Sequence, residues 1–314
     1  MNKLKKVGLT ALATTLVASS AYAGDLSVTG AASISYTGMS NAADTNPWSM
    51  GNSVKFNGSG ELDNGISFAA YWELDGNVMD DYNMNFGLPN DMGTITFIGN
   101  SGIAGGIGKV VDIVPTAYEE VYDVTDADDN GIATASLGTN PNMAYTWSGA
   151  GLMISAQYNP STGATGSSSE TTFGATYEIP GVDGLMIAAG TGSDGSETDL
   201  NTVGLKYTAG SVTAAYQVTD IDYVTASASN DEAGTHYGIS FAVNENLSIS
   251  AGKQETEFRD NKAGKVDEKN TGYSASYTAG GMSISYSFNE VENAAGSATA
   301  KDIQASILNL AFAF

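Results

Sequence analysis

The chain has 314 residues, with 35 acidic and 12 basic side chains that give a formal net charge of −23, and it contains no cysteine. So acidic a surface makes nucleic acid and anionic lipid poor partners, and the lack of cysteine excludes disulfides. The 16 tyrosines, 10 phenylalanines and 38 glycines argue against disorder and favour strands joined by turns.

The first 23 residues have the pattern of a secretory signal peptide. A start with three lysines precedes an apolar run over residues 7–18, and Ala21-Tyr22-Ala23 has the small-x-small form of a cleavage site. We therefore expect cleavage after Ala23 and a mature domain of residues 24–314. The apolar run is shorter than the roughly 20 residues of a spanning helix, and no later stretch is long enough to form one.

Nearly all of the mature chain alternates between apolar and small or polar residues. In "MSISYSFN" (residues 282–289) large apolar side chains alternate with Ser and Asn, and "LSVTGAASISY" (residues 26–36) follows the same rule. A period of two predicts strands, because a helix needs apolar residues three or four apart. Sixteen strands are predicted, over residues 25–37, 53–62, 66–74, 82–89, 94–99, 141–148, 152–158, 171–179, 185–192, 199–208, 211–219, 235–243, 247–256, 271–279, 282–290 and 301–314.

The predicted connections alternate between tight and long. Seven are short and rich in Gly, Asn and Asp, as hairpin turns are. The eight long ones span residues 38–52, 75–81, 100–140, 159–170, 193–198, 220–234, 257–270 and 291–300. Short turns at one end and long loops at the other are typical of outer-membrane barrels. The sequence therefore predicts an all-β, transmembrane, antiparallel up-and-down β-barrel of 16 strands, surrounded by outer-membrane lipid.

The polar positions of the predicted strands are assigned to the interior, because the aromatic positions are assigned to lipid. This parity predicts a lumen lined by Lys55, Glu61, Glu73, Asn83, Asn85, Lys206, Gln217 and His236. Each of them could also be ordinary solvated lining. The single histidine would need a serine and an acid within hydrogen-bond reach to act as a hydrolase, so we predict no enzyme activity and keep an outer-membrane hydrolase as the third choice.

The third connection, residues 100–140, is long and acidic. Asp112, Glu119, Glu120 and Asp123 lie in its middle, and near a constriction they would favour cations. Further along, "DADDNG" (residues 126–131) resembles the opening of a calcium loop, with Asp126, Asp128 and Asn130 as candidate metal ligands. The bidentate glutamate of such loops is missing, so an acidic turn is the simpler interpretation and a weak calcium site is the alternative. We expect no other cofactor.

The chain ends on an exposed apolar strand. Leu308, Leu310, Phe312 and Phe314 are apolar at every second position, which suits a strand that faces hydrocarbon. Upstream, the even positions 302, 304 and 306 are polar instead. Because a one-residue slip exchanges the faces of a strand, we predict a bulge or a local break of alternation near Ile307 and Leu308.

Together these features resemble the general porins of Gram-negative outer membranes, with the closest likeness to alphaproteobacterial porins. A strand such as "GTITFIGN" (residues 93–100) that leads into the long third loop, and a C-terminal phenylalanine on an alternating strand, carry the likeness. The resemblance implies a homotrimer of water-filled barrels with the third loop folded into each lumen. It also implies that the last-strand pattern is an assembly signature, read by the barrel-assembly machinery.

The resemblance predicts a constriction formed by Lys55 on the wall, opposite Asp112, Glu119, Glu120 and Asp123 on the loop. The chain departs from the family in one respect: its single arginine, Arg259, lies in a predicted external loop and not in a wall cluster. The expected function is passive diffusion of small hydrophilic solutes with a preference for cations. The alternative is a solute-specific or plugged barrel with a structural or adhesive role, which would conduct little.

Overall fold

The computed structural model describes residues 24–40, 46–76, 78–100, 105–122, 142–161, 163, 168–193, 198–223, 231–259 and 265–314. The 16 predicted strands are confirmed. Their bounds are β1 Leu26–Met39, β2 Trp48–Glu61, β3 Ser67–Asp75, β4 Val78–Gly87, β5 Thr94–Asn100, β6 Asn142–Gly149, β7 Leu152–Asn159, β8 Glu170–Glu178, β9 Leu185–Ser193, β10 Thr198–Ala209, β11 Val212–Tyr223, β12 Glu232–Ala242, β13 Leu247–Phe258, β14 Glu268–Ala279, β15 Met282–Glu292 and β16 Ile303–Ala313. Two short 3₁₀ helices, η1 (Gly106–Lys109) and η2 (Ala294–Gly296), lie in the connections. Across these described ranges, no helix is long and apolar enough to cross a bilayer.

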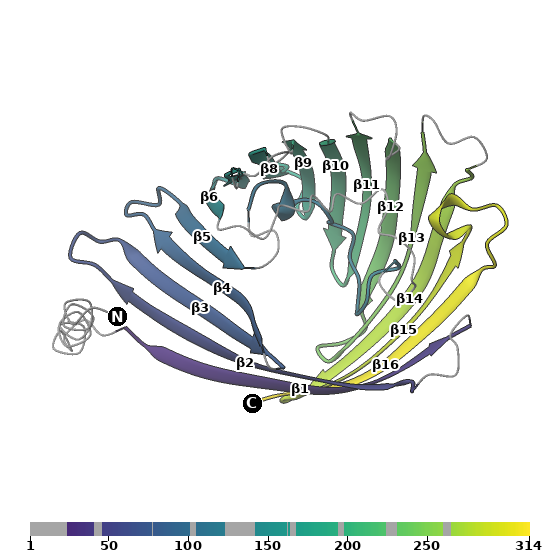
Figure 1. Cartoon of the computed structure of the whole chain (residues 1–314). Coiled ribbons are helices and arrows are strands. Elements are labelled where there is room, and N and C mark those ends of the chain that lie inside the picture. The colour runs from purple at the N-terminus through teal and green to yellow at the C-terminus, as the bar shows by residue number, and fades with distance from the viewer. Residues whose placement is uncertain are drawn as a thin grey trace.

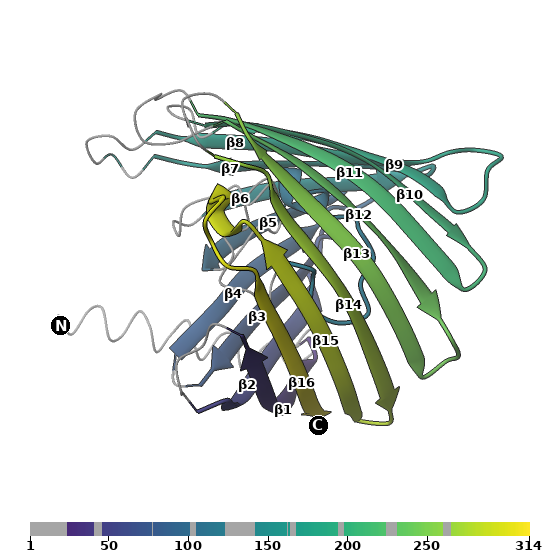
Figure 2. The ribbon, with the colours of Figure 1, turned by 90° about the vertical axis from the view of Figure 1, so that its right-hand side faces the viewer.

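The strands form one closed antiparallel barrel in which each strand pairs with its neighbours in sequence. β16 closes it by pairing with β1, from Ala31 opposite Ala313 to Met39 opposite Ala305. Figures 1 and 2 show the sheet curling from β1 round to β16. Closure pairs every strand edge, which a barrel in lipid requires. We call the end with the short turns the turn end and the opposite end the loop end.

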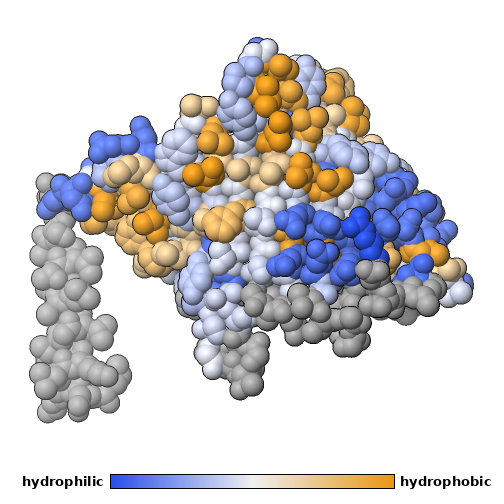
Figure 3. Space-filling view, turned by 90° about the horizontal axis from the view of Figure 1, so that it is seen from above, coloured by the Kyte–Doolittle hydropathy of each residue, from blue (hydrophilic) through white to orange (hydrophobic). Residues whose placement is uncertain are grey.

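The outer surface of the barrel is apolar and its interior is polar. On β15, Ile284 and Tyr286 are 43% and 38% exposed, whereas Ser285 and Ser287, which alternate with them, are 4% and 0% exposed. Hydrophobic side chains spread over the outer face that Figure 3 shows, and hydrophilic ones gather towards one side of it. Water disfavours so large an apolar surface, and a bilayer stabilises it.

Two hairpins at the turn end depend on the conformational freedom of glycine. Gly210, between β10 and β11, has a φ of 59°, and Gly280, between β14 and β15, has a φ of 62°. Nothing lies within 4 Å of a Cβ built on either residue. The left-handed backbone, and not a lack of space, therefore selects glycine at both turns.

The connection predicted to be long over residues 75–81 is in fact tight. β3 runs to Asp75 and β4 begins at Val78, so only residues 76–77 join them. Gly-Asn between two strands is a two-residue hairpin signal, and Val78 to Asp81 extend the strand instead of a loop. Most connections at the loop end are therefore long, but the connection between β3 and β4 is short.

The predicted bulge near Ile307 and Leu308 is wrong. β16 pairs with β15 from Ile303 opposite Val291 to Phe312 opposite Met282 without a register shift. The register shifts in the described strands lie elsewhere, between β3 and β4 and between β4 and β5.

The change of pattern along β16 reflects a change of surroundings and not of backbone. Towards the loop end, Ala305 and Val291 are buried on the inner face. On the outer face, Nε2 of Gln304 donates to Oε1 of Glu290 at 2.8 Å. Near the loop end, polar side chains of neighbouring strands hydrogen-bond to each other on the outer face. The outer face of β16 therefore changes from apolar to polar along the strand without any irregularity in the backbone.

Candidate pore constriction

The described part of the third connection, residues 105–122, lies inside the barrel along its wall (Figure 1). Four of its buried side chains, Ile107, Val110, Ile113 and Val114, pack on Ala188, Leu200, Ala215 and Ile221 of β9, β10 and β11. This is an apolar core within a polar barrel, and burial of its side chains holds the loop to one side of the interior. For these residues the predicted folding of the loop into the lumen is confirmed.

Glycines of the wall make room for the loop. They lie on the inner face of β8, β9, β10, β12 and β13, and we call them the glycine track: Gly174, Gly190, Gly204, Gly238 and Gly252. A Cβ on Gly190 would lie 2.7 Å from side-chain atoms of both Ile107 and Val110. These separations are too short for carbon atoms, so the loop can reach its position only because the wall has no side chains there.

Polar side chains of the wall hold the loop backbone along its length. The N–H of Gly105 donates to Oε1 of Gln157 at 2.9 Å, and further along the N–H of Tyr118 donates to Oγ of Ser274 at 3.0 Å. Backbone groups shielded from water need such partners. The polar lining of this half of the barrel therefore serves the loop as well as the pore.

Gln217 on β11 makes the most extensive of these contacts. Its Oε1 accepts the N–H of Ile113 at 2.9 Å, and its Nε2 donates to the carbonyls of Val110 at 2.7 Å and Val111 at 2.9 Å. The side chain is 2% exposed. The amide of Gln217 thus holds the loop backbone from Val110 to Ile113 in place. The site is buried, so leaving any of these polar groups without a hydrogen bond would be costly.

Gln217→Leu is expected to loosen the loop without opening the barrel. Each buried partner left unpaired costs about 1–3 kcal/mol, so amides over residues 107–115 should exchange hydrogen at least about tenfold faster. Hydrogen exchange followed by mass spectrometry measures this. Gln304→Leu, on the outer face, is the matched control and should leave the loop unchanged. Equal protection in both variants would show that the apolar core alone holds the loop.

Asp112 is turned towards the wall. Its Oδ1 accepts the N–H of Val114 at 2.8 Å and lies 3.5 Å from Nδ1 of His236, and its Oδ2 accepts the hydroxyl of Tyr122 at 2.7 Å. Burial opposes ionisation, but His236, Tyr122 and the Val114 N–H together hold the pKa of Asp112 below its ordinary value. Asp112 is therefore ionised at neutral pH, but its carboxylate faces His236 on β12. His236 is only 4% exposed because the loop covers it.

The opposite wall, on β2 to β4, carries the predicted basic residue. Nζ of Lys55 lies 3.3 Å from Oε2 of Glu73, which also accepts the hydroxyl of Tyr71. The next strand continues the polar lining, with Nδ2 of Asn85 donating to Oδ1 of Asn83 at 2.9 Å. Glu73 thus compensates the charge of Lys55, so this wall is less basic than Lys55 alone would make it.

The remaining predicted residues are spread around the interior. Glu61 lies on the face of Lys55, nearer the turn end, and Lys206 on β10 shares the face of Thr202 and Gly204. Glu119 and Glu120 lie on the loop beside β13 to β15. The predictions for Asp123, Asp126, Asp128 and Asn130, and for the signal peptide, fall outside the described residues.

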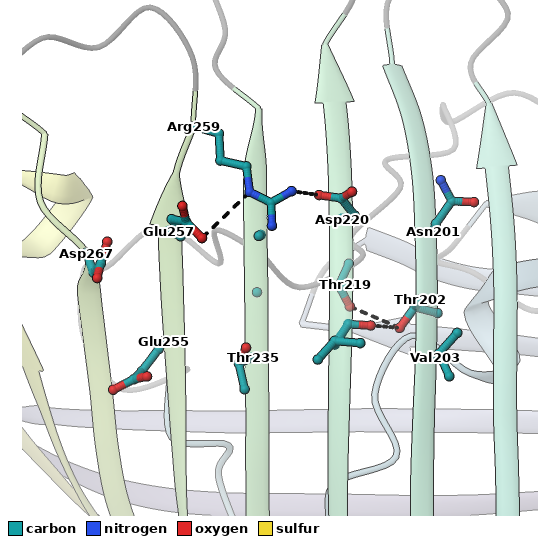
Figure 4. Close-up of a pocket in the computed structure, with 13 residues that line it drawn as sticks. Asn201, Thr202, Val203, Thr219, Asp220, Thr235, Glu255, Glu257, Arg259 and Asp267 are labelled. Atoms are coloured by element: carbon teal, nitrogen blue, oxygen red, sulfur yellow. Dashed lines mark hydrogen bonds and ion pairs between the residues drawn. The ribbon is translucent and has the colours of Figure 1, made fainter.

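The single arginine lies at the loop end, on the outer side of the barrel. Nη1 of Arg259 lies 2.7 Å from Oδ1 of Asp220, and its Nε lies 3.7 Å from Oε2 of Glu257 (Figure 4). Such exposed pairs contribute little to stability. Because Arg259 lies on the outer side of the barrel and is paired with acidic residues there, it adds no positive charge to the interior.

The main features that the sequence analysis missed are the glycine track and the contact of Gln217 with the loop. Glycines at inward positions on neighbouring strands were a signal for a segment packed against the wall. Gln217 resembled any other polar lining residue, and only the course of the loop shows its role.

Comparison with a sequence model of the family described as "Gram-negative porin" gives a match over residues 8–278. No curated protein sequence matches the chain.

Solved structures share the architecture at low identity. A variant of the Rh. blastica porin is 17% identical, with a TM-score of 0.65 over 92% of this chain and 100% of that one. A porin structure refined at 1.8 Å is 16% identical, with a TM-score of 0.68 and the same coverage. OmpT, an outer membrane protein of Vibrio cholerae, is 10% identical, with a TM-score of 0.70 over 93% of this chain and 98% of that one. These likenesses show the fold.

Proposed function

The chain belongs to the Gram-negative porin family, and from this premise we propose that its channel prefers cations to anions. As a porin it is an outer-membrane β-barrel channel for small solutes and not an enzyme. The hydrolase built on His236 is therefore excluded, and so is the plugged structural or adhesive barrel.

An excess of carboxylates on the inner face supports the proposal. Among the described residues, inward positions of the strands carry Glu61, Glu73, Glu170, Glu232 and Glu268, and the loop adds Glu119 and Glu120. The basic residues on inward strand positions are Lys55 and Lys206, and Glu73 compensates the first of them. A narrow pore lined in this way attracts cations and repels anions.

The expected size of the effect follows from Coulomb's law. One charge about 8 Å from a permeating ion in water contributes about 0.5 kcal/mol, which physiological salt reduces to about 0.2 kcal/mol. Because the contribution has opposite sign for cations and anions, each carboxylate should change the permeability ratio about twofold.

Replacing Glu119 and Glu120 together by glutamine is therefore expected to lower the cation-to-anion permeability ratio about fourfold. The zero-current potential of single channels in a potassium chloride gradient measures this ratio, with EDTA present to exclude divalent ions. Lys55→Gln should shift the potential in the opposite direction, because it leaves the charge of Glu73 uncompensated.

Glu257→Gln is the matched control, since it removes the same charge from the outer side of the barrel. A wild-type channel that prefers anions would refute the proposal. An equal shift in the control would show that surface potential, and not the pore, sets the selectivity.

The family premise also supports three further proposals. The barrels assemble as a homotrimer, the barrel-assembly machinery reads the last strand, and the signal peptide is cleaved after Ala23. A weak calcium site at Asp126, Asp128 and Asn130 is a separate proposal that rests on the sequence pattern alone.

A further inference from the structure

We propose that Asp112, Glu120 and His236 form a site for a divalent transition metal such as Zn²⁺, which clamps the third loop to β12. One ligand atom of each residue can be chosen so that all lie within 4.8 Å of one another. Two of the residues come from the loop and one from the wall. An ion held between them would therefore join two parts of the chain that are far apart in sequence.

The histidine is buried without a hydrogen-bond partner. His236 is 4% exposed, and neither Nδ1 nor Nε2 makes a hydrogen bond. A buried imidazole normally has a partner, because leaving its polar atoms unsatisfied is costly. The ring lies beside two carboxylates, so a cation is the missing partner that fits the charge of its surroundings.

The spacing also fits metal ligands better than a hydrogen bond. Nδ1 of His236 and Oδ1 of Asp112 are 3.5 Å apart, which is longer than an ordinary N–H···O bond. Two atoms bound tetrahedrally to one Zn²⁺ at about 2.0–2.1 Å lie about 3.3–3.4 Å apart. A narrow cavity of about 10 Å³, lined by both Glu120 and His236, adjoins the cluster.

The loop residues are held in place by further contacts, as metal ligands usually are. Tyr122 and the N–H of Val114 hydrogen-bond to the carboxylate of Asp112. The amide of Asn289 on β15 donates to the carbonyl of Glu120 at 2.6 Å and so fixes its backbone.

An imidazole together with carboxylates selects Zn²⁺ and similar ions over Ca²⁺, which takes oxygen ligands only. The site is separate from the sequence pattern at Asp126 and does not depend on the ion selectivity of the pore.

Isothermal titration of Zn²⁺ into the folded, untagged barrel in detergent tests the site. We expect saturable binding at one site in the wild type. His236→Gln and Asp112→Asn should each weaken it at least about tenfold, and Glu119→Gln, which removes a neighbouring carboxylate outside the cluster, should not. Heat-modifiable migration on a gel confirms that each variant is folded.

Co²⁺ provides a second measurement that needs no variant. The chain has one histidine and no cysteine, so a visible absorption spectrum typical of imidazole-bound Co²⁺, abolished by added Zn²⁺, would report His236 directly. The proposal is overturned if the wild type does not bind Zn²⁺, or if binding survives His236→Gln unchanged. Displacement of the bound Zn²⁺ by Ca²⁺ at equal concentration would also overturn it, because it would show a site made of carboxylates alone.

Discussion

Gly190→Leu is expected to displace the third loop from the barrel wall and to increase single-channel conductance. A Cβ at this position would lie 2.7 Å from Ile107 and from Val110, and the rest of a leucine side chain would enter the space that the loop occupies. Overpacking a filled interior costs about 1–3 kcal/mol. The β9 backbone is held by ladders on both sides and the loop is not, so the loop should yield.

Conductance in planar bilayers measures the effect, and migration on unheated gels shows whether the barrel is folded. Gly58→Leu is the matched control, because nothing lies within 4 Å of a Cβ built on that outward-facing glycine. Ile107→Ala combined with Gly190→Leu should restore part of the wild-type conductance, since it returns space to the loop. If conductance stays unchanged in folded Gly190→Leu, the loop can bind the wall without the glycine track.

The barrel could be predicted because local patterns of apolar and polar residues indicate its strands and turns. Ser285 and Ser287 alternate with the apolar residues Ile284, Tyr286 and Phe288, which no helix explains. Short turns at one end and long loops at the other then favoured an outer-membrane barrel over a soluble sheet. The number of strands followed from counting the alternating segments, and the closure of β16 on β1 followed from the need to pair every edge in lipid. These inferences required the order of residue types and no knowledge of contacts.

The course of the third loop could not be predicted in the same way. Its apolar residues Ile107, Val110 and Ile113 are three apart, but the spacing within so short a segment gives no indication of what the segment packs against. Parity placed Gln217 and His236 on the inner face, but it could not show that a loop more than a hundred residues earlier covers both. Long-range contacts of this kind are absent from any local pattern.

The acidic constriction was predicted from the acidic residues of the third loop and from the family resemblance, and neither shows where a carboxylate points. Asp112 faces His236 and Tyr122, whereas Glu73 on the far wall pairs with Lys55. The predicted role of Asp112 in the pore therefore stays a prediction, and its placement favours a role in holding the loop. The prediction of a bulge in β16 was wrong for a related reason. The polarity of side chains along a strand can change with their height in the membrane, without any irregularity in the backbone.

Phe314→Asp is expected to reduce folded barrel in the outer membrane of cells far more than it reduces stability in detergent. Phe314 is the last residue, is 79% exposed, and exchanges backbone hydrogen bonds with Gly30 at 2.7 and 2.9 Å. The substitution keeps this backbone pairing and puts a carboxylate at the rim. A charge near the interface costs only about 0–1 kcal/mol in such barrels.

Refolding of the purified variant in detergent should therefore remain close to the wild type, while its yield of heat-modifiable barrel in cells falls. Leu26→Asp is the matched control, because Leu26 is another exposed apolar residue at the turn end, on β1 instead of β16. If the machinery reads the last strand, only Phe314→Asp should lower the cellular yield. Equal losses for both variants would instead indicate a general need for apolar residues at the turn end. A parallel loss in detergent would show that the ring of Phe314, which lies over Gly30, stabilises closure itself.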